Sequence, residues 1–286
     1  MTRSLSTSPP PYDAYVFDLD GTLYLGEEAL PGAVGLVKAL RDRGIPMRFL
    51  SNNPTRNAAE YVDKLRRLGF EAQPEEVVTT VAATCEWLRE NYPDAVVFPI
   101  AEQPLVDALR DAGIRLSENP EEVDIVVASY DRGFTHAKLQ IAFDAIWQHK
   151  RAFLVSTNPD RYCPFPDGRG EPDCAPIVAA IEVATGTKCV ATIGKPNPHI
   201  AQTALAGMGA RAERTLMVGD RLGTDIALGH ASGMDTALVL TGDSTLQDVA
   251  DTSVKSRPTY VIERVGELLA GNVLAPKASG TISKSE

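Results

Sequence analysis

The sequence predicts an α/β protein in which a doubly wound, parallel sheet is interrupted by an inserted α/β domain. Short apolar segments that end in polar residues alternate with segments of helical periodicity near both ends of the chain. A separate alternation of the same kind occupies the middle of the chain. With 286 residues, the chain is long enough for two modest domains.

The segments of the predicted core follow one another through short connections, which favours parallel strands. The first strand, Ala-Tyr-Val-Phe at 14–17, is apolar throughout, as expected of a strand buried on both faces. The first helix has Pro31 in its first turn and Gly44 as its C-terminal stop. Core strands are expected at 14–17, 47–50, 215–218, 236–240 and 259–262, and core helices at about 31–43, 55–68, 227–231 and 263–270.

The middle block is about the size of a small domain. We therefore predict a core formed by residues 12–80 and 190–271, with an inserted domain at 81–189. The polar segments 1–11 and 272–286 are expected to be disordered tails. Within the insert, strands are expected at 95–98, 124–128 and 152–155, and helices at 135–149 and 175–184.

Composition narrows the class of protein. A hydrophobic fraction of 44% and a charged fraction of 23% are typical of a soluble globular protein, and no apolar run approaches the roughly 20 residues of a membrane helix. Residues 1–11 lack the apolar core of a secretory signal. A net charge of −10 disfavours nucleic acid and anionic membranes as partners. We expect a cytoplasmic protein with reduced thiols and no zinc site, because no C-x-x-C pair is present.

Four polar clusters follow or lie near predicted core strands. Ligands of open α/β sheets bind at the carboxyl ends of the strands, so we expect the four clusters to meet there. The clusters are Asp18-Leu19-Asp20-Gly21-Thr22, Ser51-Asn52-Asn53, Gly194-Lys195-Pro196-Asn197-Pro198 and Gly219-Asp220-Arg221-Leu222-Gly223-Thr224-Asp225.

The residue types in these clusters suit phosphoryl transfer. Converging carboxylates repel one another unless a cation lies among them, and Mg²⁺ is the hard ion that such oxygen ligands favour. One carboxylate can attack phosphorus, while a second protonates the leaving oxygen and later deprotonates water. A lysine and N–H or hydroxyl donors stabilise the charge on the transferring group. The clusters therefore predict a Mg²⁺-dependent phosphatase.

The motifs D-x-D-G-T, S-N-N, G-K-P and G-D-R-L-G-T-D, in this order, resemble the haloacid dehalogenase-like (HAD) superfamily from about residue 12 to 270. The position of the insert resembles the type IIA branch, which includes NagD-like proteins, p-nitrophenyl phosphatases, and pyridoxal phosphate and phosphoglycolate phosphatases. The resemblance implies a Rossmannoid core, an inserted cap of type C2, and hydrolysis of a small phosphorylated metabolite such as a sugar phosphate, glycerol phosphate or phosphoglycolate. It leaves open a homodimer formed through the cap.

The resemblance also assigns a role to each matching acidic or basic residue. Asp18 would be the nucleophile that forms an aspartyl-phosphate, and Asp20 the general acid and base. Lys195 would neutralise Asp18 and the transferring group. Mg²⁺ would be held by Asp18, by the backbone carbonyl of Asp20 and by Asp220, with Asp225 supporting its waters or holding Lys195.

The serine motif is assigned to phosphate binding. The Ser51 hydroxyl and the backbone N–H of Asn52 would hold the phosphoryl oxygens, with Asn53 beside them. An ordinary N-terminal helix cap is the alternative for this motif, and also for Asp225. One departure is visible, because many relatives have Asp where this chain has Gly223.

The inserted domain resembles the family's larger α/β cap through a D-R-x-F-T turn and a T-N-P-D strand end. The segment Pro-Asp-Cys-Ala-Pro at 172–176 departs from the Gly/Ala-rich turn that is common there. Such a loop can face the leaving group of the substrate, so Asn158, Arg161 and Asp173 are candidates for substrate specificity. For Arg161 and Asp173, taken alone, the sequence favours solvated surface over a role in specificity.

The rivals to a phosphatase are another enzyme of the same fold, either a dehalogenase or a phosphomutase, and a regulatory protein that binds phosphate. A dehalogenase of the same fold needs no acid at Asp20, and a phosphomutase would be expected to carry a different cap. A phosphate-binding regulatory protein with little turnover would be favoured by loss of Asp18, Asp20 or Lys195, and all three are present. Fold analogy alone does not separate these functions, but the complete residue set favours the phosphatase.

Overall fold

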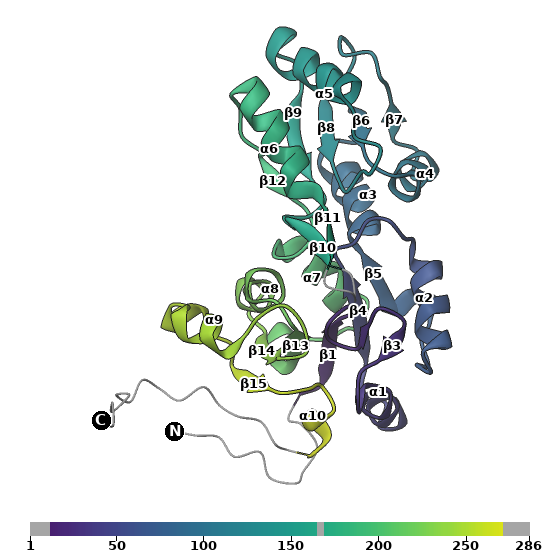
Figure 1. Cartoon of the computed structure of the whole chain (residues 1–286). Coiled ribbons are helices and arrows are strands. Elements are labelled where there is room, and N and C mark those ends of the chain that lie inside the picture. Colours follow the sequence, from purple (N-terminus) through teal and green to yellow (C-terminus); the bar gives the residue numbers. More distant parts are fainter. Residues whose placement is uncertain (1–11, 165–168, 271–286) are drawn as a thin grey trace, which may run out of the picture. The chain divides into compact units, whose positions relative to one another are not determined.

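The computed structural model describes residues 12–164 and 169–270 (Figure 1). The tails expected at 1–11 and 272–286 lie outside these residues. The chain divides into two compact units, Met1–Met47 with Ala210–Glu286, and Arg48–Gly209. The two units are defined by contacts within the chain. The boundaries expected from the sequence, a core at 12–80 and 190–271 and a cap at 81–189, stay a prediction. Among the described helices, none has both the length and the apolar character needed to cross a bilayer.

The first unit contains a parallel sheet with helices between its strands. Its strands pair in the spatial order β15 (Tyr260–Ile262), β14 (Asp235–Val239), β13 (Thr215–Gly219) and β1 (Ala14–Asp18). Every residue of β1 and β13 is buried, in keeping with the apolar residues at 14–17 and 216–218. The other elements are the hairpin β2 (Tyr24–Leu25) and β3 (Glu28–Ala29), with helices α1 (Ala33–Asp42), α8 (Ala227–Ala231), α9 (Leu246–Asp251) and α10 (Glu267–Ala270).

The elements predicted for this unit are present, with one difference at the C-terminal end. A helix was expected at 263–270, but α10 begins at Glu267. The preceding turn packs backbone to backbone against the start of α1. A Cβ atom on Gly266 would lie 2.8 Å from the Cα atom of Gly32. This close approach at Gly266 holds the chain in a turn where helical periodicity alone favours a helix.

The second unit is built around a parallel sheet in the order β12 (Ala191–Thr192), β9 (Phe153–Ser156), β8 (Ile125–Ala128), β6 (Val96–Ile100) and β7 (Arg115–Leu116). Helices α5 (His136–Phe143) and α6 (Cys174–Thr185) cover one face of it, where Ile146 and Ile177 pack with Phe98 and Leu154 (Figure 1). The antiparallel hairpin of β10 (Tyr162–Pro164) and β11 (Gly170–Pro172) precedes α6.

The remaining elements of this unit include segments before, within and after the predicted insert. Strand β4 (Met47–Ser51), which begins at the boundary of the units, pairs in parallel with β5 (Val77–Thr79). Helix α2 begins at Ala58, three residues later than expected, because Asn57 and Glu60 form a reciprocal capping box. The helices are α2 (Ala58–Arg67), α3 (Thr80–Asn91), α4 (Gln103–Asp111) and α7 (Pro198–Ala206).

Candidate active site

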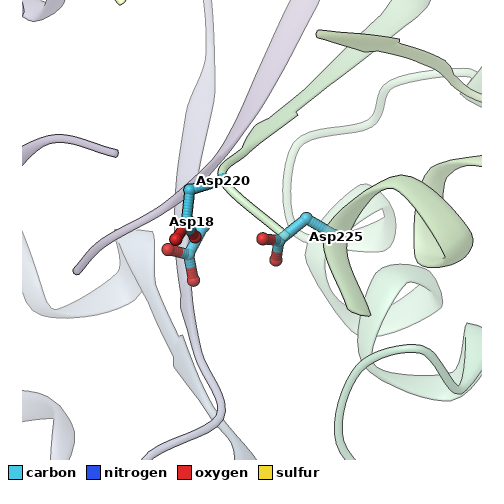
Figure 2. Close-up of side chains that lie close together, drawn as sticks. All are labelled: Asp18, Asp220 and Asp225. Carbon is cyan, nitrogen blue, oxygen red and sulfur yellow. The ribbon is translucent and has the colours of Figure 1, made fainter. Parts of the chain in front are cut away.

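Three carboxylates of the first unit point toward one another (Figure 2). We call Asp18, Asp220 and Asp225 the carboxylate cluster. One ligand oxygen from each lies within 4.8 Å of the other two. Asp18 ends β1 and Asp220 directly follows β13, and these strands are parallel neighbours. The cluster therefore lies at the carboxyl ends of adjacent parallel strands, where ligands of open α/β sheets bind.

Glycines make room for these carboxylates. A Cβ atom on Gly219 would lie 2.3 Å from the carboxyl carbon of Asp225, and one on Gly242 would lie 2.0 Å from Oδ2 of Asp220. Gly21 has a φ of +80°, and its Cβ would lie 2.7 Å from the same oxygen. The D-x-D-G-T turn therefore needs glycine for its backbone conformation and for the close approach of Asp220.

The loop at 241–244, after β14, was missed by the sequence reasoning. The backbone N–H of Asp243 donates to Oδ2 of Asp220 over 2.8 Å, and the hydroxyl of Ser244 accepts from the N–H of Leu222 over 3.1 Å. The hydroxyl of Thr241 donates to the carbonyl of Gly21 over 2.5 Å. Its T-G-D-S sequence at the end of a predicted strand was the available signal.

The electrostatics of the cluster favour a bound cation. Burial, followed by the negative charges of Asp18 and Asp225, raises the pKa of the Asp220 carboxyl well above its usual range. Asp220 is 4% exposed and Asp225 is 1% exposed, so water screens their charges poorly. A hard divalent cation with oxygen ligands fits this donor set, because its charge offsets the mutual repulsion.

Other residues of the two aspartate motifs surround the cluster. Asp20 is exposed and forms a backbone bridge with Tyr24. The hydroxyl of Thr22 donates weakly to Asp18, at 3.4 Å. Asp225 also accepts from the N–H of Arg221 at 3.0 Å, so it stabilises the start of the turn at 222–226 in addition to joining the cluster. The capping alternative and the cluster position are thus compatible for Asp225.

The serine motif lies at the end of β4 in the second unit. Ser51 is buried, donates to the hydroxyl of Tyr61 over 2.8 Å and accepts from the N–H of Asn53 over 3.2 Å. The helix-cap alternative for this motif is wrong, because α2 is capped by Asn57. Tyr61 was not singled out from the sequence, because it lies next to the apolar position Val62 and looks like an ordinary residue of α2.

The side chain of Asn52 holds the backbone of Lys195. Its Oδ1 accepts from the Lys195 N–H over 2.8 Å, and its Nδ2 donates to the Lys195 carbonyl over 3.0 Å. The Lys195 side chain is buried, at 2% exposure. The structure thus brings the S-N-N and G-K-P motifs together, although 143 residues separate Asn52 from Lys195.

Comparisons with known proteins identify the family. A family model described as haloacid dehalogenase-like hydrolase matches residues 15–115, and a HAD-hydrolase-like model matches residues 192–268. An acid sugar phosphatase of Staphylococcus aureus is 39% identical over 260 residues, which cover 91% of this chain and 97% of the relative. The chain belongs to the haloacid dehalogenase-like hydrolases.

Solved structures refine this placement among the HAD-like hydrolases. A 4-nitrophenylphosphatase of Thermotoga maritima is 33% identical with a TM-score of 0.83, covering 91% of this chain and 97% of that one. A glycerol phosphate phosphatase of Mycobacterium tuberculosis, solved with calcium, is 32% identical with a TM-score of 0.80, covering 90% and 74%. These similarities confirm the type IIA placement, the α/β fold with a Rossmannoid core and cap, and the class of phosphoric monoester hydrolase.

The three cap residues singled out from the sequence of this HAD-like hydrolase differ in exposure. Asn158 is fully buried and Asp173 is 4% exposed, so the solvated-surface alternative is wrong for Asp173. Asp173 caps α6 by accepting from the N–H of Cys174. Arg161 is exposed and lines a surface hollow of about 560 Å³ between the β10–β11 hairpin and α6. Of the three, only Arg161 presents its side chain to solvent.

The departure at Gly223 from the usual HAD pattern is sterically neutral. Gly223 is exposed, and a Cβ atom there would meet nothing within 4 Å. A side chain at this position would therefore point into open space, and its absence removes no contact of the carboxylate cluster.

Proposed function

We propose that this HAD-like phosphatase is Mg²⁺-dependent and transfers a phosphoryl group from a small phosphorylated metabolite to Asp18 and then to water. The carboxylate cluster carries the proposal. Asp18 ends a buried strand beside two further carboxylates that a divalent cation would neutralise. A carboxylate held in this way is a suitable nucleophile for phosphorus.

In the first step, an oxygen of Asp18 attacks phosphorus, and the bond from phosphorus to the leaving oxygen breaks. Asp20, which is exposed, gives its proton to that oxygen. In the second step, Asp20 takes a proton from water, the water oxygen attacks phosphorus, and the bond from phosphorus to Asp18 breaks. Inorganic phosphate and the two original carboxyl groups result.

The serine and lysine motifs would hold the phosphoryl oxygens during both steps. The hydroxyls of Ser51 and Tyr61 are hydrogen-bonded to each other, and a hydroxyl can rotate to donate or accept. If the Tyr61 hydroxyl releases its weak 3.4 Å hydrogen bond to the Asn53 carbonyl, it can donate to Ser51 and leave the Ser51 hydrogen for a phosphoryl oxygen. Lys195 supplies the positive charge that an acidic protein must provide locally, since its net charge is −10.

The residues proposed to hold the metal are Asp18, Asp220 and the backbone carbonyl of Asp20, with Asp225 supporting the metal's waters. Bound Mg²⁺ supplies positive charge that lets an anionic nucleophile approach an anionic phosphoryl group. The calcium in the mycobacterial glycerol phosphate phosphatase supports a hard-cation site, since calcium also takes oxygen ligands.

The names of the relatives support a sugar phosphate or glycerol phosphate as substrate. The test is hydrolysis of p-nitrophenyl phosphate, and of a panel of sugar, glycerol and nucleoside phosphates, by protein stripped with EDTA. We expect activity to require added Mg²⁺ and to fall when calcium replaces it. Full activity after exhaustive stripping would contradict the metal-dependent mechanism.

A further inference from the structure

The amide of Asn52 is fixed in one orientation by three hydrogen bonds. Oδ1 faces the N–H of Lys195, and Nδ2 faces the Lys195 carbonyl, so exchanging the two amide atoms would break both contacts. The second hydrogen of Nδ2 is directed to Oδ2 of Asp160, at 3.3 Å. Asp160 therefore stabilises the one orientation of Asn52 that pairs with the backbone of Lys195.

Asp160 is itself held by the cap loop that follows β9. The same oxygen, Oδ2, accepts from Nδ2 of Asn158 over 2.9 Å, and that nitrogen also donates to Asp173 over 3.0 Å. The carbonyl of Asp160 accepts from the N–H of Ala175, in the first turn of α6. A continuous set of hydrogen bonds thus connects the start of α6 to the backbone of Lys195.

Gly194, the residue before Lys195, is packed so closely that its backbone has little room to move. A Cβ atom on Gly194 would lie 2.5 Å from the carbonyl oxygen of Thr157 and 2.6 Å from Oδ1 of Asn52. The N–H of Gly194 also donates to that Thr157 carbonyl over 2.8 Å. A shift of the loop after β9 would therefore be transmitted to the segment that carries Lys195.

We propose that Asp160 is a positioning residue that orients Asn52 and, through it, fixes the backbone of Lys195 for phosphoryl transfer. This inference rests on the proposed function for its kinetic consequence, but its structural consequence is independent of activity. Asn52 then has two separate tasks, because its backbone N–H is proposed to bind phosphate while its side chain holds Lys195.

The first test is residue-resolved hydrogen–deuterium exchange at the Lys195 amide, whose N–H is bonded to Asn52. Loss of one hydrogen bond predicts exchange about 5-fold faster in Asp160→Ala. Asp160→Asn retains an acceptor oxygen and should restore the wild-type rate. Asp124→Ala is the control for loss of a hydrogen-bonded carboxylate in the same unit, because Asp124 accepts from the backbone N–H of Val96 at the amino end of β8. It should leave exchange at Lys195 unchanged.

The second test is a double-mutant cycle on p-nitrophenyl phosphate hydrolysis. If Asp160 acts through Asn52, Asp160→Ala lowers kcat by about 5-fold in the wild-type background and by less than about 2-fold in the Asn52→Ala background. KM should change less than kcat. Equal losses in both backgrounds, or wild-type exchange at Lys195 in Asp160→Ala, would overturn the inference. Absence of hydrolysis by the wild-type protein would instead overturn the proposed function, and the exchange measurement would still decide the role of Asp160.

Discussion

Replacing Asp220 by Asn should make the order of stability of variant and wild type depend on whether magnesium is present. Two unit charges no more than 4.8 Å apart, as the ligand oxygens of the carboxylate cluster are, repel by at least about 3.5 kcal/mol at an effective dielectric constant of about 20. Asp220→Asn removes the charge of the carboxyl whose pKa is raised by burial and by its acidic neighbours, with little change of shape. Without metal, the variant should therefore be as stable as the wild type or more stable.

With magnesium, the order should invert. A metal that binds only the folded state adds about 2.7 kcal/mol at a free concentration of 100 times Kd, equivalent to a Tm increase of roughly 5–10 °C for a chain of this size. The wild type should gain this increase, and Asp220→Asn should gain little of it because a ligand is lost.

The assay is thermal unfolding of both proteins in EDTA and in excess MgCl₂. Asp42→Asn is the control for a change of net charge, because Asp42 is 61% exposed and pairs with Lys38 on α1, away from the cluster. It should respond to magnesium as the wild type does. If Asp220→Asn gained the same Tm increase as the wild type, the cluster would not be the metal site.

Three further predictions concern Asp20, Gly194 and two buried cysteines. Asp20→Asn should slow turnover by roughly 10²–10⁴-fold, the usual cost of a lost general acid and base, with circular dichroism unchanged. Gly194→Ala should destabilise the protein by about 1–3 kcal/mol, measured by denaturant unfolding, because its Cβ would lie 2.5 Å from a backbone carbonyl oxygen; a loss below about 0.5 kcal/mol would contradict that packing. Burial raises the pKa of Cys85 to about 11 and that of Cys174 to about 12, so both should stay protonated and unreactive toward Ellman's reagent at pH 8 in the native state. Rapid modification of either thiol in folded protein would show that its burial is wrong.

The elements that the sequence predicted well are those with strong local patterns. The apolar runs at 14–17 in β1 and 216–218 in β13 lead directly into Asp18 and into Gly219-Asp220, so both the strand and the position of its carboxylate follow from the sequence. Helix α4 was not predicted, and it tolerates Pro104 because this residue occupies the first turn, where no intrahelical N–H bond is lost. Helix α3 was also not predicted, because it begins with threonine and its apolar residues form only a weak helical pattern.

The parts of the site that were missed depend on tertiary contacts. Nothing local distinguishes Gly242 from an ordinary turn glycine, and its importance comes from the approach of Asp220. Asp173 looked like surface because charged residues are mostly exposed, but the amide of Asn158 and the start of α6 bury it. Asp160 is the last residue of the T-N-P-D strand end, but its contact with Asn52 could not be predicted because 108 residues of sequence separate the two.

The most direct test of the account is chemical trapping of the phosphorylated enzyme. Protein supplied with p-nitrophenyl phosphate and Mg²⁺ is quenched in acid and reduced with borohydride, which converts an acyl phosphate to an alcohol. Peptide mass spectrometry then locates the reduced side chain. The account predicts homoserine at position 18, dependent on both substrate and metal and absent from Asp18→Asn. Modification at Asp20 or Asp220 instead, or hydrolysis by Asp18→Asn at a near-normal rate, would contradict nucleophilic attack by Asp18.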